Sequence, residues 1–452
     1  MWYLLYNVLL ILVSPVILLV LLAKQRCRRG LPQRLGLTPE RDGGTEQGAA
    51  PRVIWVHAVS LGEVVAVAPL VRDLRTTYPD ARLVVSTVTE TGREAVEQRL
   101  ADIAAHRYAP LDFPWVVNRA LDAVKPSLYL FVETELWPNM LRALHRRGIP
   151  SIMVNGRLST RSYRRQRWPL IRDFYRTMLS LVTVCLVQSE RDAQRMVELG
   201  ADPARVRCTG NIKFDQPVPQ ASAKGAGLSK AGLGVADHER VFVAGSTHPG
   251  EEEAVLAAYE RLIPKFPDLV LIMAPRHVER AAQVEQVVRA RGLAVFRRSQ
   301  GDGTMAGTGP RVMVLDTRGE LALLYREAAV TLVGGTLVPI GGHNLLEPAV
   351  WGKPVLFGPY TDHCAEVAGL LTDAGGGQVV ATSEALAERV GALLLDPERL
   401  HRMGQAARDV VVRNQGALRR SLEVIATYLP PHAASAERVE EPSWELSSRH
   451  TT

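Results

Sequence analysis

Short apolar runs that alternate with helix-like segments constrain the fold of this 452-residue chain more than any other feature. In the first half of the chain such runs lie at 53–56, 83–87, 128–132, 152–154 and 182–187. Helical patterns, such as those at 63–77, 92–104 and 191–199, lie between them. Continuous apolar strands that are separated by helices predict a parallel sheet with both faces covered.

The alternation breaks and then resumes. Residues 216–236 contain two prolines and four glycines, and we interpret them as an inter-domain linker or a loose surface loop. Strand-like runs follow at 241–244, 269–274, 312–315, 329–333, 354–357 and 378–381. We therefore predict an α/β fold with two Rossmann-like, doubly wound domains, at 30–215 and 237–430, and a polar tail at 431–452. Ligands bind at the carboxyl ends of strands in such folds, so we expect the two domains to face a cleft.

The N-terminal residues 2–23 carry no charge and are rich in Leu, Val and Ile. A helix of this length reaches about 33 Å, enough to cross a bilayer. A cleaved signal peptide is the alternative, but it requires positive charge before the apolar run and an Ala-x-Ala-like site after it. Positive charge instead follows the run, at Lys24, Arg26, Arg28, Arg29 and Arg34. The positive-inside rule thus predicts an uncleaved, single-pass anchor at 1–23 with all later residues in the cytoplasm.

Composition excludes several classes of site. The four cysteines are scattered without a CxxC pair, which argues against a zinc site or a disulfide scaffold and fits a reducing compartment. No Asp-x-Asp pair follows a strand, so a metal-held diphosphate is not indicated. We predict neither a metal nor a cofactor.

The glycine-rich stretch 334–348 follows the strand-like run 329–333 and precedes the run 354–357. A strand, a glycine turn and a helix start are typical of phosphate sites, because glycines let backbone N–H groups approach an anion. The alternative is a glycine-rich connection without a ligand. The residues that we expect to bind here are Gly342, Asn344, Leu345, Leu346 and Glu347.

Polar residues also follow the strands of the first domain. Ser60, Gly62 and Glu63 come after the first strand, where Glu63 is either a general base or a complement to the helix dipole. Glu133 and Glu135 follow the strand at 128–132; one of them could serve the reaction and the other could bind backbone or arginine. Near the end of the domain, the side chain of Lys213 can reach the cleft.

In the second domain, Ser246 follows the first strand and precedes an acidic helix start at 251–253. Pro275 and Arg276 follow the next strand, and the planar fork of an arginine pairs well with phosphate. We interpret His248 and His277, each taken alone, as structural.

The segment 157–176 is rich in arginine and aromatic residues. Such a segment fits nucleic acid, an anionic membrane surface, a phosphorylated lipid or a solvated helix face. The apolar N-terminus favours lipid, so no nucleic-acid partner is expected.

Several motifs occur in a characteristic order: Ser-Leu-Gly-Glu (60–63), Glu-Thr-Glu-Leu-Trp-Pro-Asn (133–139), Asn-Gly-Arg-Leu-Ser (155–159), Gly-Asn-Ile-Lys-Phe-Asp (210–215), Gly-Ser-Thr-His (245–248), Ala-Pro-Arg-His (274–277) and Gly-Gly-His-Asn-Leu-Leu-Glu-Pro (341–348). Together they resemble the 3-deoxy-D-manno-octulosonic acid (Kdo) transferases of lipopolysaccharide synthesis, over roughly residues 1–430. The resemblance implies a GT-B glycosyltransferase that moves Kdo from CMP-Kdo to the phosphorylated lipid A precursor, lipid IVA, with inversion at the anomeric carbon. It also implies residence in the inner membrane.

The resemblance also suggests roles for the candidate residues. Glu63 would accept the proton of the acceptor hydroxyl, and Glu133 would support the acceptor or the developing positive charge. Arg276, Lys213 and the helix start at Asn344 would stabilise the departing phosphate. The ribose or cytosine would contact Glu347 and the turn Arg318, Gly319 and Glu320, while segment 157–176 would meet acceptor phosphates and inner-membrane lipid. The alternatives are a UDP-sugar-dependent GT-B enzyme that makes another glycolipid, and a non-enzymatic, membrane-tethered module that binds anionic lipid.

Overall fold

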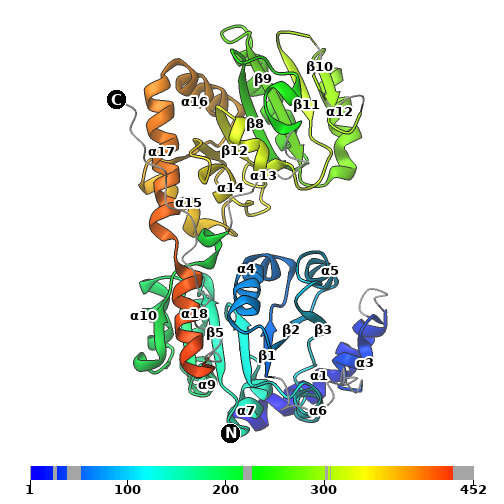
Figure 1. Ribbon diagram of the computed structural model, residues 1–452, viewed down its shortest axis with the longest axis vertical. Helices are drawn as coiled ribbons and strands as arrows, with labels where there is room; N and C mark the ends of the chain where they lie inside the picture. Colours follow the sequence, from blue (N-terminus) through cyan, green and yellow to red (C-terminus); the bar gives the residue numbers. More distant parts are fainter. Residues whose placement is uncertain are drawn as a thin grey trace. The chain divides into compact units, whose positions relative to one another are not determined.

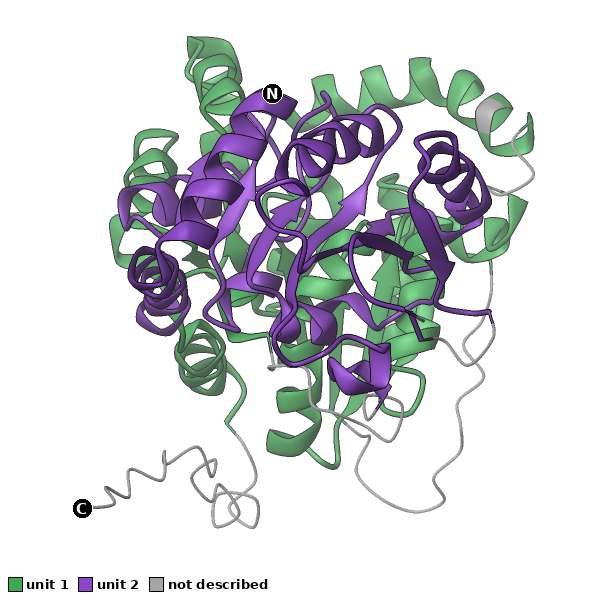
Figure 2. Ribbon diagram, turned by 90° about the horizontal axis from the view of Figure 1, so that it is seen from above, with its two compact units in different colours: residues 1–216, 415–452 green, residues 217–414 purple. Residues whose placement is uncertain are grey.

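The computed structural model describes residues 2–23, 28–37, 52–216, 227–300, 304–305 and 307–430. The chain divides into two compact units: unit 1 comprises residues 1–216 and 415–452, and unit 2 comprises residues 217–414 (Figure 2). Each unit contains a parallel, seven-stranded sheet flanked by helices (Figure 1). The predicted α/β fold with two Rossmann-like domains is therefore confirmed.

Unit 1 has the strand order β3-β2-β1-β4-β5-β6-β7. Its strands are β1 (Val53–His57), β2 (Arg82–Thr87), β3 (Ala105–Tyr108), β4 (Leu128–Val132), β5 (Ser151–Gly156), β6 (Val184–Val187) and β7 (Val206–Cys208). Its helices are α1 (Trp2–Ala23), α3 (Leu31–Arg34), α4 (Leu61–Thr77), α5 (Glu90–Arg99), α6 (Pro114–Val124), α7 (Pro138–Arg146), α8 (Thr160–Gln166), α9 (Pro169–Leu179), α10 (Glu190–Glu198) and α18 (Ala417–Tyr428), with short 3-10 turns η1 (Pro203–Arg205) and η2 (Ile212–Asp215). The sequence pattern missed β3 and β7, which are the two edges of this sheet.

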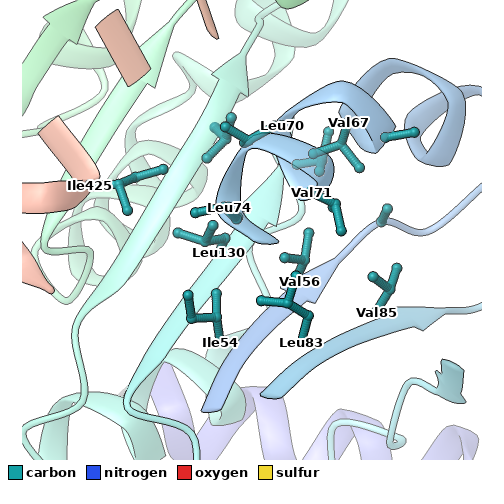
Figure 3. Packing of buried hydrophobic residues seen from close by; sticks show 14 of the residues in the cluster. Ile54, Val56, Val67, Leu70, Val71, Leu74, Leu83, Val85, Leu130 and Ile425 are labelled. Carbon is teal, nitrogen blue, oxygen red and sulfur yellow. The ribbon is translucent and has the colours of Figure 1, made fainter. Parts of the chain in front are cut away.

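The core of unit 1 explains why its central strands are apolar throughout. Every residue of β1 and β4 is buried, because helices cover both faces of the sheet. On one face, Leu70 and Leu74 of α4 pack with Ile54 and Val56 of β1 (Figure 3). Full burial of one such side chain contributes about 1.5–3 kcal/mol. This packing holds α4, and with it the start of that helix, against the end of β1.

Helix α18 belongs to unit 1, although the sequence analysis assigned residues up to 430 to the second domain. The side chain of Ile425 is buried in the same core as Leu74 (Figure 3). The Asp215 carboxylate also accepts hydrogen bonds from the backbone N–H groups of Gly416, at 2.5 Å, and Leu418, at 2.7 Å. Apolar burial and helix capping together place this C-terminal helix with the first unit.

Unit 2 has the strand order β10-β11-β9-β8-β12-β13-β14. Its strands are β8 (Arg240–Thr247), β9 (Leu269–Pro275), β10 (Ala294–Arg297), β11 (Arg311–Val314), β12 (Val330–Val333), β13 (Val355–Phe357) and β14 (Gly377–Val379). Its helices are α11 (Glu251–Leu262), α12 (Ala281–Ala290), α13 (Leu321–Leu324), α14 (Leu346–Ala349), α15 (Ala365–Asp373), α16 (Ser383–Leu395) and α17 (Pro397–Asn414), with 3-10 turns η4 (Ala231–Leu233), η5 (Val278–Arg280) and η6 (Tyr325–Glu327). Strand β10, which the sequence pattern missed, is again an edge.

Part of the expected linker at 216–236 belongs to the core of unit 2. Its second half packs into unit 2, where Leu228, Leu233 and Val235 are 1%, 0% and 3% exposed and lie in one cluster with Val241 and Val243 of β8. Burial of these apolar side chains outweighs the glycine-rich composition that suggested a loose loop. Residues 217–226 of the expected linker, and the expected polar tail at 431–452, lie outside the described residues.

Candidate functional site

In unit 1 the sheet reverses its strand order between β1 and β4, which are parallel neighbours with His57 opposite Phe131. Connections that leave two such strands diverge, so their carboxyl ends form the position where doubly wound folds bind ligands. Glu63 follows β1 and Glu133 follows β4. Two of the predicted catalytic residues therefore come from the two sides of this switch point.

Glu63 lies in the first turn of α4. Its carboxylate accepts hydrogen bonds from the backbone N–H of Val59, at 2.7 Å, and from Ser60 Oγ, at 3.1 Å. Burial raises the pKa of Glu63 to about 7, and the nearby charges of Glu133 and Glu135 act in the same direction, against the two hydrogen bonds. The carboxylate thus caps the helix and also titrates near neutrality, so the two interpretations of this residue are compatible. Gly62 is exposed in the same turn.

Glu133 has a left-handed backbone, with φ of 56°, which is rare for a residue other than glycine. Asn155, at the end of neighbouring β5, shares this strain with φ of 58°. Such conformations persist only where surrounding contacts hold them, and they are concentrated at functional sites. Lys213 Nζ lies 4.0 Å from Glu133 Oε1, while Glu135 accepts a hydrogen bond from Trp137 Nε1 at 3.1 Å. The structure therefore brings Glu63, Glu133 and Lys213 to one edge of unit 1.

A buried chain of amide side chains holds Lys213 in place. Asn155 Oδ1 accepts a hydrogen bond from the N–H of Ile212, and Gln188 Nε2 donates to the Asn155 carbonyl, both at 3.1 Å. Asn211 Nδ2 donates to Gln188 Oε1, and Asn211 Oδ1 accepts from the N–H of Lys213, again at 3.1 Å. Sequence reasoning missed Gln188, because its partners lie 23 and 33 residues away and no local pattern marks it.

Unit 2 repeats this arrangement between β8 and β12. Ser246, near the end of β8, has a left-handed φ of 57°. Gly334, which follows β12, lies so close that an added Cβ would approach the Ser246 carbonyl oxygen to 2.5 Å. Glycine is required at 334 because two backbone segments meet there. The predicted glycine turn is thus present at the switch point of unit 2.

The N–H groups of this turn bind a carboxylate of the protein itself. Glu251, fully buried at the start of α11, accepts hydrogen bonds from the N–H groups of Gly335, Thr336 and Leu337 at 2.7, 3.1 and 2.8 Å. It also accepts from the N–H of His248 at 2.9 Å. Glu251 thus pairs three of the amides that we expected to approach a phosphate, and phosphate binding by the rest of the stretch 334–348 stays a prediction. Glu251 lies 84 to 86 residues before these three residues in the chain.

Replacing Glu251 with Gln is expected to lower the free energy of unfolding by about 3 kcal/mol or more. The amide nitrogen of Gln cannot accept a hydrogen bond, so buried N–H groups would be left unpaired. Chemical denaturation of the full-length chain measures the loss. Glu253→Gln is the matched control, because Glu253 is exposed and accepts only the N–H of Gly250, at 3.0 Å, among the hydrogen bonds of the described residues. Equal stability of the two variants would contradict the structural role of Glu251.

The expected helix start at Asn344 is also corrected. Helix α14 has only four residues and begins at Leu346, so it lacks the aligned peptides that create a substantial helix dipole. Asn344 Oδ1 accepts the N–H of Leu346 at 3.2 Å, and Asn344 Nδ2 lies 3.4 Å from Glu347 Oε1. Gly342, Leu345 and Leu346 are buried, and the N–H of Gly342 donates to the Gly335 carbonyl at 2.7 Å.

Arg276 supplies an exposed positive charge next to this loop. Its backbone N–H donates to the Thr247 carbonyl at 2.9 Å, which fixes the residue directly after buried Pro275, at the end of β9. Burial raises the pKa of Glu347, and the Arg276 charge opposes this rise. The structure therefore brings Arg276 and Glu347 into the same electrostatic neighbourhood.

Three histidines that the sequence analysis did not assign to the site surround Arg276. His248 Nε2 and His343 Nε2 are 2.7 Å apart with their rings stacked, and the ring of His277 lies 6.0 Å from that of His248. Burial, together with the Arg276 charge, lowers the pKa of His343 to about 4. No group of three or more His, Cys, Asp or Glu within the described residues is arranged to hold a metal.

The turn at Arg318, Gly319 and Glu320 forms contacts within unit 2. Arg318 forms an exposed ion pair with Glu279 at 2.6 Å, and Glu320 accepts from Arg298 Nε at 3.4 Å. Gly319 is exposed with φ of 86°. The role of this turn in binding a nucleotide stays a prediction, as does the predicted cleft between the domains.

Comparisons with known proteins show the family of this chain. A family model described as 3-deoxy-D-manno-octulosonic-acid transferase (kdotransferase) matches residues 29–216. The 3-deoxy-D-manno-octulosonic acid transferase of Haemophilus influenzae is 35% identical over 95% of this chain and 99% of its own length. That of Bordetella pertussis is 34% identical over 84% of this chain and 88% of its own. The chain belongs to the Kdo transferase family.

The solved structures add the fold of this Kdo transferase. UDP-GlcNAc 2-epimerase from Neisseria meningitidis superposes with a TM-score of 0.59 over 83% of this chain and all of the other, at 17% identity. Likeness at this identity concerns architecture alone, and it supports the GT-B fold class. The protein is therefore a Kdo glycosyltransferase with the α/β, GT-B-type fold that the motifs predicted.

Proposed function

We propose that this Kdo transferase moves Kdo from CMP-Kdo to the phosphorylated, tetra-acylated precursor of lipid A, lipid IVA, with inversion at the anomeric carbon. The reaction takes place at the cytoplasmic face of the inner membrane, to which α1 and the basic segment 157–176 attach the protein. The observation that carries the proposal is the Glu63 carboxylate, which lies at the switch point of unit 1 with a pKa raised to about 7. A general base works best with a pKa near the working pH.

Glu63 acts on the acceptor. Each carboxylate oxygen accepts one hydrogen bond from the protein and keeps a second lone-pair direction for the acceptor hydroxyl. As the hydroxyl oxygen forms its bond to the anomeric carbon, its proton passes to Glu63. The bond from that carbon to the CMP phosphate breaks at the same time, and CMP departs with the electron pair. Attack opposite the leaving group inverts the anomeric centre.

Fixed positive charge assists the departure of CMP. The transition state resembles an oxocarbenium ion next to a departing phosphate, so preorganised cations that bind that phosphate lower the barrier. Arg276 is the principal candidate, since Glu251 occupies the N–H groups of Gly335 and Thr336. Glu133 stabilises the developing positive charge, and Lys213 lies 4.0 Å from its carboxylate.

Incubation of the purified protein with CMP-Kdo and lipid IVA is expected to yield lipid IVA that is heavier by Kdo, together with free CMP. Mass spectrometry of the lipid identifies the product. Competition by CMP but not by UDP is expected, and preferential competition by UDP would instead favour the alternative, a GT-B enzyme that uses a UDP-sugar. Release of CMP without a lipid product would contradict the assigned acceptor.

The pH dependence of kcat/KM is expected to report the titration of Glu63. Because burial raises this pKa to about 7, the base is largely protonated at pH 6 and the rate rises as pH increases through 7. Replacing Glu135 with Gln removes a nearby negative charge, so the rising limb should move to lower pH. A limb that stays in place in this variant would disagree with the electrostatic account.

A further inference from the structure

The N-terminal helix α1 has one face that is half-buried along its whole length. The half-buried positions after Trp2 recur every three or four residues: Tyr3, Tyr6, Asn7, Leu10, Ser14, Ile17 and Leu21. A single helical face has this spacing. A helix that left unit 1 at one end and crossed a bilayer alone would show no such face, so the burial pattern indicates that α1 lies lengthwise.

Polar contacts hold the N-terminal end of α1 against unit 1. The amides of Asn7 and Asn139, the latter in α7, bond reciprocally at 3.1 and 2.8 Å. Tyr6 donates its hydroxyl to Asp112 at 3.0 Å, and Trp2 Nε1 donates to Asp173 in α9. Asp112 is itself fixed, because it accepts the N–H groups of Asn139 and the following residue at the start of α7.

The C-terminal end of α1 leads to a second attachment. Helix α3 begins eight residues after α1 ends (Figure 1). Arg34 in α3 donates to the carbonyl of Val88, and Gln33 accepts the N–H of Tyr108, so α3 is bound to unit 1 beside β3. The N-terminal end of α1 and the helix that follows its C-terminal end are therefore both bound to unit 1.

A bilayer-spanning placement conflicts with these contacts. In that placement Asn7, 16 residues before Ala23, would lie about 24 Å from the end of the helix that adjoins unit 1. It would then be in the acyl chains without Asn139, keeping the bond from Nδ2 to the Tyr3 carbonyl at 2.7 Å but leaving its Oδ1 without the donor of Asn139, which is unfavourable there. Length and hydropathy alone allow the span, since α1 is the one helix among the described residues that could cross a membrane by those criteria.

The outer face of α1 is apolar at each exposed position. Its large side chains are 44–72% exposed, namely Leu4, Leu5, Val8, Leu9, Ile11, Leu12, Val13, Val16, Leu18, Leu19 and Leu22. The apolar surface extends onto α9, where Phe174 contacts the rings of Trp2 and Tyr6. Leu170, one turn earlier in α9, is 73% exposed, and Trp168 is 69% exposed. Water is a poor solvent for a continuous stripe of this kind, which marks a binding surface.

The surroundings of the stripe are basic. Segment 138–180, which includes α7, α8 and α9, has ten arginines and a single acidic residue, Asp173. Apolar side chains next to arginines and an exposed tryptophan are typical of surfaces that enter the boundary between headgroups and acyl chains of anionic lipid.

We propose that α1 lies in the plane of the membrane rather than across it, with its outer face in one leaflet and its inner face docked on unit 1. This inference rests on the membrane attachment stated under the proposed function, and it specifies how α1 makes that attachment. The occupant of the stripe is an anionic lipid leaflet. Residues 2–23 then stay on the same side of the bilayer as the catalytic units, and unit 1 rests directly on the surface that presents a lipid acceptor.

Disulfide trapping in native membranes tests the docking. The full-length double variant Asn7→Cys/Asn139→Cys is expected to crosslink internally under mild oxidation, with a shift in mobility on a non-reducing gel. Val8→Cys/Asn139→Cys is the matched control, because Val8 is adjacent in sequence but 46% exposed on the outer face. The control contains the same native cysteines and should not crosslink. A double variant that transfers Kdo normally but does not crosslink would overturn the proposal.

Labelling of intact spheroplasts with a membrane-impermeant maleimide tests the topology. Leu4→Cys should stay unlabelled in intact spheroplasts, whereas a spanning helix would expose this end outside and label at once. Fractionation of the same cells distinguishes failure of membrane attachment from failure of the catalytic proposal. Recovery in the soluble fraction with normal Kdo transfer would overturn membrane attachment, and this inference with it, while leaving the catalytic proposal intact.

Discussion

Replacing Glu63 with Gln is expected to reduce kcat by about 10³-fold, with little effect on the affinity for CMP. Gln has almost the same shape and keeps one oxygen to accept the N–H of Val59, but it cannot accept a proton. General-base catalysis contributes on the order of 10²–10⁴-fold, which sets the expected loss. The measurement is single-turnover transfer from CMP-Kdo to lipid IVA, together with CMP titration.

Glu253→Gln is the matched control for this experiment. Glu253 is the third residue of α11, as Glu63 is the third of α4, and its carboxylate likewise accepts a backbone N–H before the helix. If Glu63 only capped its helix, the two variants would lose activity and stability to a similar, small extent. Substantial residual turnover in Glu63→Gln would refute the general-base role.

Replacing Arg276 with Ala is expected to weaken CMP binding by about 10- to 100-fold. A hydrogen bond between charged groups contributes about 1.5–3 kcal/mol, and every 1.4 kcal/mol is tenfold in Kd. With the amides of the glycine turn bound to Glu251, the exposed guanidinium has a larger share of phosphate binding than it would in a turn with free amides. Isothermal titration with CMP measures the change.

Two further variants sharpen this test. Arg276→Lys keeps the charge but loses the planar fork, so its affinity should lie between those of the wild type and Arg276→Ala. Arg289→Ala removes another arginine from unit 2, one that is 66% exposed and pairs with Glu285 within α12, and should leave CMP affinity unchanged. Unaltered affinity in Arg276→Ala would count against phosphate binding by this residue.

The three strands that sequence reasoning missed all lie at sheet edges, although it recovered the edge strand β14. The central strands β1, β4 and β9 are buried at every residue and therefore read as uninterrupted apolar runs. Strands β3, β7 and β10 lie at edges, have exposed positions and are no more than four residues long. A short edge strand has little apolar signal, and its neighbour in the sheet decides its conformation.

The residues of the candidate site also fall into two groups, those that the sequence indicates and those that only the structure reveals. The positions of Glu63, Glu133 and Arg276 near strand ends were predictable, because each comes shortly after a strand-like run that is visible in the sequence. The amide chain through Gln188 and the histidine cluster around Arg276 were not, because their members come from strands and loops far apart in sequence. The helix start at Asn344 was overestimated, since four residues of helix resemble the beginning of a longer one.

Taken alone, the sequence determined the α/β class, the two sheets, the motif order of a Kdo transferase and the acidic and basic groups at strand ends. These follow from hydrophobic periodicity and from residues that are adjacent in the chain. Tertiary structure alone decided that Glu251 fills the glycine turn, that α18 completes unit 1 and that α1 docks through Asn7 on Asn139. The tertiary fold pairs buried polar groups and apolar faces with residues that are 84 to more than 200 positions away in the chain. No local sequence pattern specifies partners at such separations.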